Sequence, residues 1–276
     1  MESRTLNDGT TIPALGFGTY PLTGGKGQAV LLRAIDAGYR LLDSAVNYGN
    51  EVDVGDAIRR SRVPRAEFVI QSKIPGRHHA YEKALASVRT TLQRMGIEQL
   101  DVGLIHWPNP SVGLYGQAWR ALVDAQRDGL VRTIGVSNFH PHHLARIIDV
   151  TGVVPAINQV EMHPYFPQVE LRAEHERLGI VTEAWSPLAK GMNPFAEPAI
   201  ADTAATYGVS PAQVILKWHL QLGSVPLPKS EDAARQRANL ELSGFELTAA
   251  ELAAITALGR TDGRRFGGDP DRHEES

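Results

Sequence analysis

Four side chains in the first part of the chain have the types needed to move a proton and orient a carbonyl group. They are Asp43, Tyr48, Lys73 and His106. The ordinary pKa of a phenol is about 10, and a neighbouring ammonium group lowers it by stabilising the phenolate. A carboxylate beside the lysine would keep the ammonium charged, and an imidazole can hydrogen-bond a carbonyl oxygen. This set predicts a site that reduces a carbonyl, with the hydride supplied by a cofactor because no side chain can supply one.

Asp43 and Lys73 also have a simpler interpretation as a structural ion pair, because a charge at the end of an apolar strand needs a partner. The apolar segments RLLD and FVIQSK end in these two residues. Polar residues after the other apolar segments favour the catalytic interpretation, since an ion pair does not require them. They are His106-Trp107, Ser137-Asn138, Gln159, Trp185-Ser186 and Lys229-Ser230.

Short apolar segments rich in Val, Ile and Leu alternate along the chain with amphipathic ones. Strands are expected at residues 14–19, 40–43, 68–73, 100–106, 133–137, 156–160, 180–185 and 224–227. Helices are expected at residues 28–38, 51–60, 81–95, 117–128, 141–150, 169–178, 199–207, 211–222, 231–240 and 248–258. Eight strand–helix units predict an α/β fold of the (β/α)8 TIM-barrel type. Active sites of such barrels lie where the strands end, so the residues above would share one mouth.

The two ends of the chain add to this expected barrel. Residues 4–12, with Asn7-Asp8-Gly9 at their centre, predict an N-terminal β-hairpin. A capping box from Thr248 to Glu251 opens an extra C-terminal helix. Residues 260–276 are rich in glycine and charge, which predicts an irregular tail that could lie over one barrel mouth, with its last residues disordered. We expect residues 1–276 to form a single domain.

A doubly wound open sheet is the rival fold, and its usual sign is a G-x-G-x-x-G turn after the first strand. Here Gly16-Phe17-Gly18 is followed by Thr19, Tyr20 and Pro21, so the third glycine is missing. Residues 24–27, GGKG, lack the spacing of a phosphate-binding P-loop, and no Ser or Thr follows the lysine. We expect them to form a flexible loop.

The composition limits the partners of the protein. Its net charge is −3, from 28 basic and 31 acidic residues, which favours neither nucleic acid nor an anionic membrane. The N-terminus has no apolar signal-peptide core, no apolar run is long enough to span a membrane, and cysteine is absent, so we expect a cytoplasmic protein. The histidines at 78–79 and 140–143 have no carboxylate at ligand spacing, which predicts solvated surface and no metal.

Five segments of the chain resemble, in order and at the right spacing, signatures of the aldo-keto reductases. The first segment is residues 42–51, in which LDSA at 42–45 and YGNE at 48–51 together resemble the family's L-D-T-A…Y-G-N-E signature. The other four are LIHWP at 104–108, IGVSNF at 134–139, NQVE at 158–161 and PKS at 228–230. The resemblance runs from about residue 5 to residue 260. The WSPL segment at 185–188 looks like that of bacterial members such as the 2,5-diketo-D-gluconate reductases.

The resemblance implies reduction of an aldehyde or ketone to an alcohol, with NADP(H) as cofactor. Tyr48 would be the general acid, Asp43 and Lys73 would tune it, and His106 would orient the carbonyl. The implied cofactor contacts are Gly18, Thr19, Tyr20, Asp43, Ser137, Asn138, Gln159, Trp185, Ser186, Pro187, Leu188, Ala189, Lys229, Ser230, Arg235 and Asn239.

Within this set, the resemblance places the amide and hydroxyl side chains of Ser137, Asn138 and Gln159 at the nicotinamide carboxamide. It places Trp185 against the nicotinamide ring. The backbone of residues 186–189 would contact the pyrophosphate, and Asn239 would contact the adenine.

Lys229, Ser230 and Arg235 match the family's site for the 2′-phosphate of NADPH. The physical interpretation agrees, because two cations and a hydroxyl at a loop and helix start form a phosphate site. This favours NADPH over NADH. Ala238 departs from the family, which usually has Glu or Gln there against the adenine amino group, so adenine binding could be weaker.

The candidate substrate contacts are Tyr20, Tyr48, His106 and Trp107, with Val46 and Phe266 as further wall candidates. A short C-terminal loop predicts an open pocket, and small aldehydes, α-dicarbonyls and keto-sugars all stay open as the small-molecule substrate. The family default is a monomer. A nucleotide-binding regulatory subunit with little turnover, similar to the potassium-channel β subunits, is the alternative function. A metal-dependent barrel isomerase is disfavoured by the missing ligand set.

Overall fold

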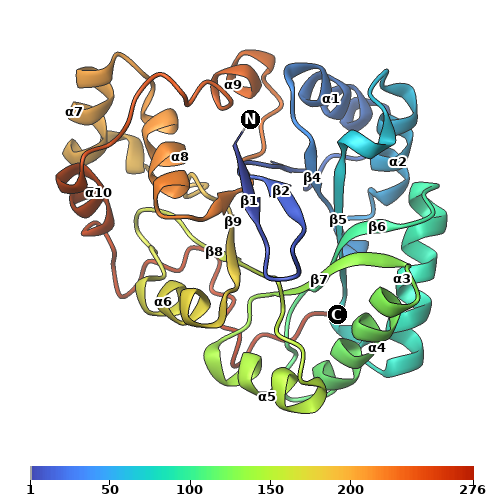
Figure 1. Cartoon of the computed structure of the whole chain (residues 1–276). Helices are drawn as coiled ribbons and strands as arrows, with labels where there is room; N and C mark the ends of the chain where they lie inside the picture. The colour runs from blue at the N-terminus through green and yellow to red at the C-terminus, as the bar shows by residue number, and fades with distance from the viewer. Residues whose placement is uncertain (1) are drawn as a thin grey trace.

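Eight parallel strands form the central sheet of the computed structural model, which describes residues 2–276 (Figure 1). The sheet closes because the backbone N–H groups of Gly16 and Gly18 donate to the carbonyls of Pro226 and Pro228, at 3.1 and 3.2 Å. This confirms the predicted TIM barrel. The strands are β3 (Phe17–Gly18), β4 (Leu41–Asp43), β5 (Val69–Ile74), β6 (Leu100–Ile105), β7 (Val131–Ser137), β8 (Ile157–Glu161), β9 (Val181–Trp185) and β10 (Val225–Pro226).

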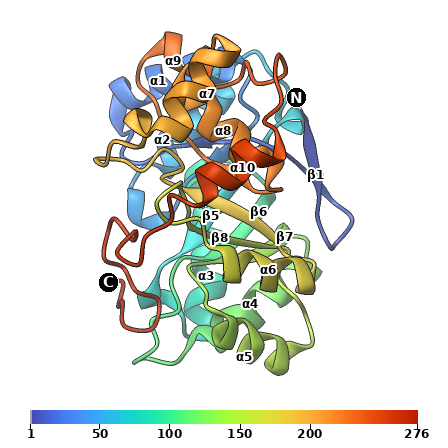
Figure 2. The same cartoon turned by 90° about the vertical axis from the view of Figure 1, so that its left-hand side faces the viewer.

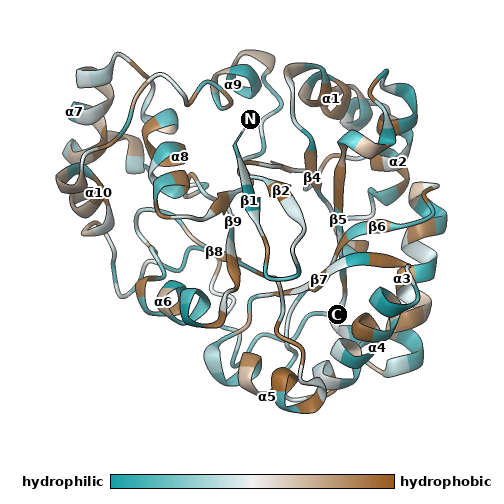
Figure 3. Ribbon diagram, in the orientation of Figure 1, coloured by the Kyte–Doolittle hydropathy of each residue, from teal (hydrophilic) through white to brown (hydrophobic). Residues whose placement is uncertain are grey.

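Ten α-helices of residues 2–276 surround or extend the barrel, and they bury one face each against the sheet or a neighbouring helix. In α4, for example, Trp119 and Leu122 are fully buried. Hydrophobic residues gather on the strands and inner helix faces, while hydrophilic residues cover the outer turns (Figure 3). The helices are α1 (Gly24–Ala37), α2 (Glu51–Arg60), α3 (Tyr81–Met95), α4 (Tyr115–Arg127), α5 (Pro141–Thr151), α6 (Val169–Leu178), α7 (Pro198–Tyr207), α8 (Pro211–Gln221), α9 (Ala233–Ala238) and α10 (Ala249–Thr256).

The two chain ends lie at opposite ends of the barrel (Figure 2). The predicted N-terminal hairpin is present, since β1 (Ser3–Thr5) pairs antiparallel with β2 (Thr11–Pro13). It buries Leu6 and Ile12 in the same cluster as strand residues of the barrel and so covers the end away from the strands' carboxyl termini. The C-terminal tail after α10 has no helix or strand and runs along the other mouth.

The prediction of a flexible loop at residues 24–27 is wrong, because these glycines form the first turn of α1. The neighbouring residue Thr23 makes no side-chain cap. Asp53, from α2, accepts the Gly24 N–H at 2.9 Å and caps the helix instead. Gly27 packs so closely on Leu22 that a Cβ there would lie 2.6 Å from its backbone. The glycine run therefore serves helix entry and close packing.

None of the helices within residues 2–276 is both long enough and apolar enough to cross a membrane.

Candidate active site

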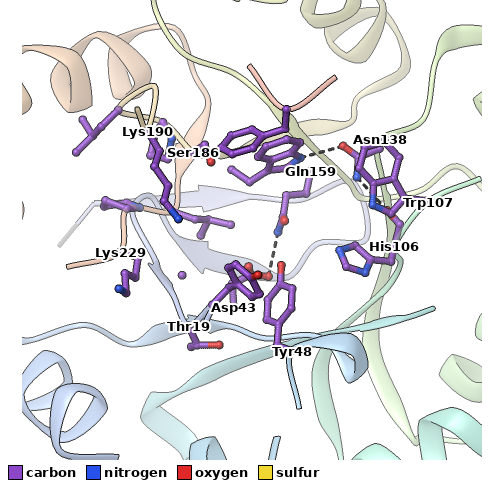
Figure 4. A pocket seen from close by; sticks show the side chains of 18 residues that line it. Thr19, Asp43, Tyr48, His106, Trp107, Asn138, Gln159, Ser186, Lys190 and Lys229 are labelled. Carbon is purple, nitrogen blue, oxygen red and sulfur yellow. Dashed lines mark hydrogen bonds between the residues drawn. The ribbon is translucent and has the colours of Figure 1, made fainter. Parts of the chain in front are cut away.

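Asp43, Tyr48 and His106 lie together at the carboxyl-terminal mouth of the barrel (Figure 4), and Lys73 joins them through its hydrogen bonds to Asp43 and Tyr48. Asp43 ends β4, Lys73 lies one residue before the end of β5, His106 follows β6, and Tyr48 ends the 3-10 helix η1 (Val46–Tyr48). The Lys73 ammonium donates to Asp43 Oδ1 at 2.6 Å and to Tyr48 Oη at 3.2 Å. The ring centroids of Tyr48 and His106 are 5.8 Å apart. Residues far apart in the sequence thus form one cluster.

Burial and charge act in opposite directions on this cluster. Burial raises the pKa of the Tyr48 hydroxyl above its ordinary value, and the charge of Lys73 lowers it again in part. Burial works to lower the pKa of Lys73, but Asp43 and Tyr48 together raise it above its ordinary value. The ammonium therefore stays charged beside a neutral phenol, which can release its proton as negative charge develops on a nearby oxygen.

Asn50 fixes the loop that presents Tyr48. Its side-chain oxygen accepts the Ser44 hydroxyl at 2.7 Å, and its amide donates to the Thr19 carbonyl at 3.0 Å. Gly49 has φ of +65° and lets the chain turn directly after η1. Gly49 and Asn50, which follow Tyr48 in the YGNE segment, therefore hold the tyrosine at the mouth.

Glu275, from the C-terminal tail, reaches the far side of this cluster. His106 Nδ1 lies 2.6 Å from Glu275 Oε1, and only 10% of the Glu275 side chain is exposed. The Gly76 N–H donates to Glu275 Oε2 at 3.1 Å, and the Asn109 amide donates to the Glu275 carbonyl at 2.6 Å. The expectation of a disordered chain end is wrong at this point, because polar groups of two barrel loops, after β5 and after β6, hold Glu275 in place.

The carboxylate of Glu275 acts on the protonation of His106. Burial lowers the pKa of His106 below its ordinary value, and Glu275 raises it again in part. Burial also works to raise the pKa of Glu275, but His106 and the Gly76 N–H outweigh it and leave that pKa below its ordinary value. A charged carboxylate at Nδ1 fixes the orientation of the imidazole and leaves Nε2 free for another partner.

A cavity of about 470 Å³ opens beside this cluster, a size typical of small-molecule sites. The predicted residues that line it are Gly18, Thr19, Tyr20, Asp43, Tyr48, His106, Trp107, Asn138, Gln159, Trp185, Ser186, Pro187, Leu188, Lys229 and Phe266. Seven predicted residues do not line the cavity: Lys73, Ser137, Ala189, Ser230, Arg235, Asn239 and the wall candidate Val46. Three lining residues were not predicted: Lys190, Leu227 and Pro228.

The cavity walls suit a phosphorylated nicotinamide cofactor. Lys190 and Lys229 bring cations from two different loops, and Lys190 extends into the cavity (Figure 4). The Trp185 indole donates to Asn138 Oδ1 at 2.9 Å, which holds a flat ring at the wall. Asn138 and Ser186 have φ of +63° and +50°, a left-handed backbone that is uncommon for non-glycine residues and is often found at active sites. The two lysine ammonium groups and the indole ring of this wall therefore fit the phosphates and the nicotinamide of NADP(H).

Comparison with known proteins identifies the family. Residues 14–260 match the Aldo/keto reductase family. The chain belongs to the aldo-keto reductases. This reductase is 54% identical to 2,5-diketo-D-gluconic acid reductase B of Corynebacterium sp. (strain SHS752001), over 98% of this chain and 97% of that one. It is 40% identical to morphine 6-dehydrogenase of Pseudomonas putida, over 96% and 93% of the two chains.

Solved structures agree with this assignment. A Gox0644 mutant in complex with NADPH superimposes on the reductase with a TM-score of 0.94, at 37% identity and covering 99% of this chain and 98% of that one. The protein is an NADP(H)-dependent oxidoreductase that reduces small-molecule carbonyl compounds.

The predicted 2′-phosphate residues of the reductase lie together next to the cavity. Arg235 Nε donates to Ser230 Oγ at 3.4 Å, and Lys229 Nζ donates to Glu231 Oε1 at 2.5 Å. Glu231 is exposed, so its pairing with Lys229 is easily exchanged for a phosphate. Asn239 is buried in the structure described here, with only 6% of its surface exposed.

Glu183 is a buried carboxylate of the reductase that sequence analysis did not single out. It lies on β9 below the cluster, and the side-chain amides of Gln71 and Gln159 each donate to both Glu183 Oε2 and Asp43 Oδ1, at 2.8 to 3.0 Å. Burial and the charge of Asp43 raise the pKa of Glu183 to about 7. Two carboxylates thus share two amides inside the barrel, and one of them titrates near neutrality.

Glu183→Gln is expected to stabilise the reductase at alkaline pH. The folded protein keeps the Glu183 proton to a higher pH than the unfolded chain, so this group lowers the free energy of unfolding as pH rises from its ordinary pKa through about 7. We expect the variant to be more stable than wild type by about 1–3 kcal/mol at about pH 8, and by little at about pH 5. Urea unfolding at both pH values checks this. An equal difference at the two pH values contradicts it.

Glu275→Gln is expected to move the pH dependence of the reductase. Because Glu275 raises the pKa of His106, its removal lowers that pKa, and the limb of the kcat/KM profile that reports His106 shifts to lower pH. Glu274→Gln is the matched control, since Glu274 is exposed and contacts the Ser111 N–H. A profile of Glu275→Gln that coincides with that of the control would remove Glu275 from this role.

Proposed function

We propose that Tyr48 donates the proton to the substrate oxygen in carbonyl reduction, and accepts it back in alcohol oxidation. Asp43 and Lys73 tune Tyr48, and His106 orients the carbonyl. The observation that supports this most is the Lys73 ammonium, which bonds both Asp43 and the Tyr48 hydroxyl at the cavity. NADPH supplies the hydride when bound. The ammonium beside the phenol stabilises the phenolate that proton transfer leaves behind.

We propose the following contacts for the cofactor. Ser137, Asn138 and Gln159 hold the carboxamide, and Trp185 stacks on the nicotinamide. The backbone of residues 186–189 contacts the pyrophosphate, with Lys190 beside it. Gly18, Thr19, Tyr20 and Asp43 complete the nicotinamide end, and Lys229, Ser230, Arg235 and Asn239 hold the 2′-phosphate and adenine.

For the substrate we propose a keto-sugar acid such as 2,5-diketo-D-gluconic acid, bound against Tyr20, Tyr48, His106 and Trp107. The name of the relative at 54% identity supports this choice. Lys190 also supports it, because a cation at the cavity wall attracts an anion. The relative at 40% identity is named for morphine, so the family alone does not determine the substrate.

The test is an assay of NADPH oxidation against a panel of carbonyl compounds that includes 2,5-diketo-D-gluconic acid, small aldehydes and α-dicarbonyls. We expect turnover with the keto-sugar acid, with the highest kcat/KM of the panel. Faster turnover of another class would replace the substrate proposal. NADPH binding without turnover of any compound would favour the alternative of a regulatory subunit.

We further propose that the reductase is a cytoplasmic monomer. The net charge of −3 and the absence of a membrane-spanning helix within residues 2–276 are compatible with this. Light scattering of the purified protein measures the mass directly, and a mass of two or more chains would contradict the monomer.

A further inference from the structure

A cluster of metal-binding side chain types lies outside the cavity, where α5 begins. His140 Nδ1, His142 Nε2 and His143 Nε2 lie 2.9, 3.3 and 3.7 Å from the same oxygen, Asp271 Oδ1. All four atoms lie within 4.8 Å of one another. Asp271 comes from the C-terminal tail, so only folding supplies the carboxylate that the HPHH segment lacks in the sequence.

This arrangement has more imidazoles than an ion pair needs. One histidine would neutralise Asp271, yet three ring nitrogens approach one carboxylate oxygen. Zn²⁺ binds nitrogen and oxygen ligands at about 2.0–2.2 Å, so neighbouring ligands around a tetrahedral ion lie roughly 3.3 Å apart. The distances from Asp271 to His140 and His142 are close to that spacing, and small side-chain rotations would open the centre for an ion.

The hydrogen bonds distinguish ligands from a supporting residue. His143 Nδ1 accepts the backbone N–H of His140 at 3.2 Å, so the proton of a neutral His143 is on Nε2 and that nitrogen cannot bind a metal. His143 Nε2 lies 3.7 Å from Asp271 Oδ1, on the side of the carboxylate from which an N–H group could orient a metal ligand. His140 and His142 can bind as neutral imidazoles through Nδ1 and Nε2, with the proton on the other ring nitrogen.

We propose that His140, His142 and Asp271 form a site for a divalent ion of the zinc type, with His143 orienting the carboxylate and water completing the coordination. The site is accessible, because the side chains of His142 and Asp271 are 63% and 46% exposed. The N-terminus of α5 is the positive end of the helix dipole, which disfavours a cation. The negative charge of Asp271 offsets this effect. Imidazole and carboxylate ligands favour Zn²⁺ over Mg²⁺, which prefers an all-oxygen shell.

A bound ion would tie the tail to α5. Asp271 lies four residues before Glu275, and between them the His273 ring packs on Trp107 with centroids 4.1 Å apart. The proposed ion therefore anchors the segment that brings Glu275 to His106. This inference is independent of the proposed substrate and catalytic roles, since its readout is metal binding.

The experiment is a titration of tag-free full-length protein with Zn²⁺, in competition with a chromogenic zinc indicator. We expect one Zn²⁺ per chain for wild type, and a loss of affinity of about tenfold or more in His142→Ala and Asp271→Asn. Both residues are exposed, so the variants should fold. His78→Ala, which removes a histidine outside the cluster, is the matched control and should bind as wild type does.

Two further readouts make the outcome decisive. Zn²⁺ should raise the thermal midpoint of wild type and of His78→Ala, because a ligand that binds only the folded state stabilises it, and Mg²⁺ should not. The proposal is overturned if wild type binds no Zn²⁺ in competition, or if His142→Ala and Asp271→Asn bind it as tightly as wild type.

Discussion

Replacing Tyr48 by phenylalanine is expected to lower kcat for carbonyl reduction by about 10²–10⁴-fold, the usual contribution of a general acid. The variant keeps the aromatic ring, which packs at 5.1 Å from the Tyr20 ring, and loses only the hydroxyl that accepts from Lys73. NADPH affinity should stay near that of wild type, because the hydroxyl is assigned no cofactor contact. Steady-state assays and NADPH titration by fluorescence measure the two effects separately.

Tyr207→Phe is the matched control for this loss. The Tyr207 hydroxyl donates to Glu251 on the outside of the barrel, at 3.0 Å, and takes no part in the site. We expect normal turnover in the control. Normal turnover in Tyr48→Phe itself would remove Tyr48 from its assigned role, and a parallel loss of NADPH binding would point to a damaged site.

Lys229→Ala or Arg235→Ala is expected to reduce the preference of the reductase for NADPH over NADH. Each variant removes a cation that we assign to the 2′-phosphate, and loss of a hydrogen bond to a charged group costs about 1.5–3 kcal/mol. This corresponds to a rise in the KM for NADPH of roughly 10–150-fold. The KM for NADH, which has no 2′-phosphate, should change little. The ratio of kcat/KM values for the two cofactors measures the effect.

Arg237→Ala provides the control on the same helix. Arg237 is an exposed cation of α9 that we assign no phosphate contact, so its removal should leave the cofactor ratio unchanged. Equal effects of Lys229→Ala on NADPH and NADH would contradict the 2′-phosphate assignment. Equal effects of all three variants would indicate a general charge effect at this mouth.

The barrel and the catalytic cluster could be predicted because local patterns encode them. Eight apolar segments alternate with helices, and strand ends in a barrel meet at one mouth, so Asp43, Lys73 and His106 had to lie close together. The strand boundaries were less predictable at the seam. β3 and β10 are only two residues long, because Pro226 and Pro228 have no N–H for the ladder.

The features that sequence analysis missed depend on partners far along the chain. Residues 24–27 contain glycines that favour a loop, and only Asp53 from α2 shows that they start a helix. The tail is polar and glycine-rich, which is typical of disorder, yet Asn109 and Gly76 hold Glu275 beside His106. Asp271 likewise reaches the histidines of α5 from more than a hundred residues away.

Within the site, one omission could have been avoided. Lys190 directly follows the segment predicted to hold the pyrophosphate, and a cation at that place is a recognisable signal. Glu183 had no such signal, since a glutamate inside a strand of alternating residues can face solvent or core. Its role depends on Gln71 and Gln159, whose amides bridge it to Asp43.

One mouth of the barrel is expected to join hydride transfer from NADPH to proton donation by Tyr48. Steady-state rates can hide the chemical step behind cofactor release, so the most direct test is a single turnover. Wild type and Tyr48→Phe, each saturated with NADPH, are mixed with the best carbonyl substrate, and nicotinamide oxidation is followed in the first turnover. We predict a rapid phase in wild type that is slowed by at least about 10²-fold in the variant. A rapid phase of equal rate in both proteins would show that Tyr48 is not the proton donor.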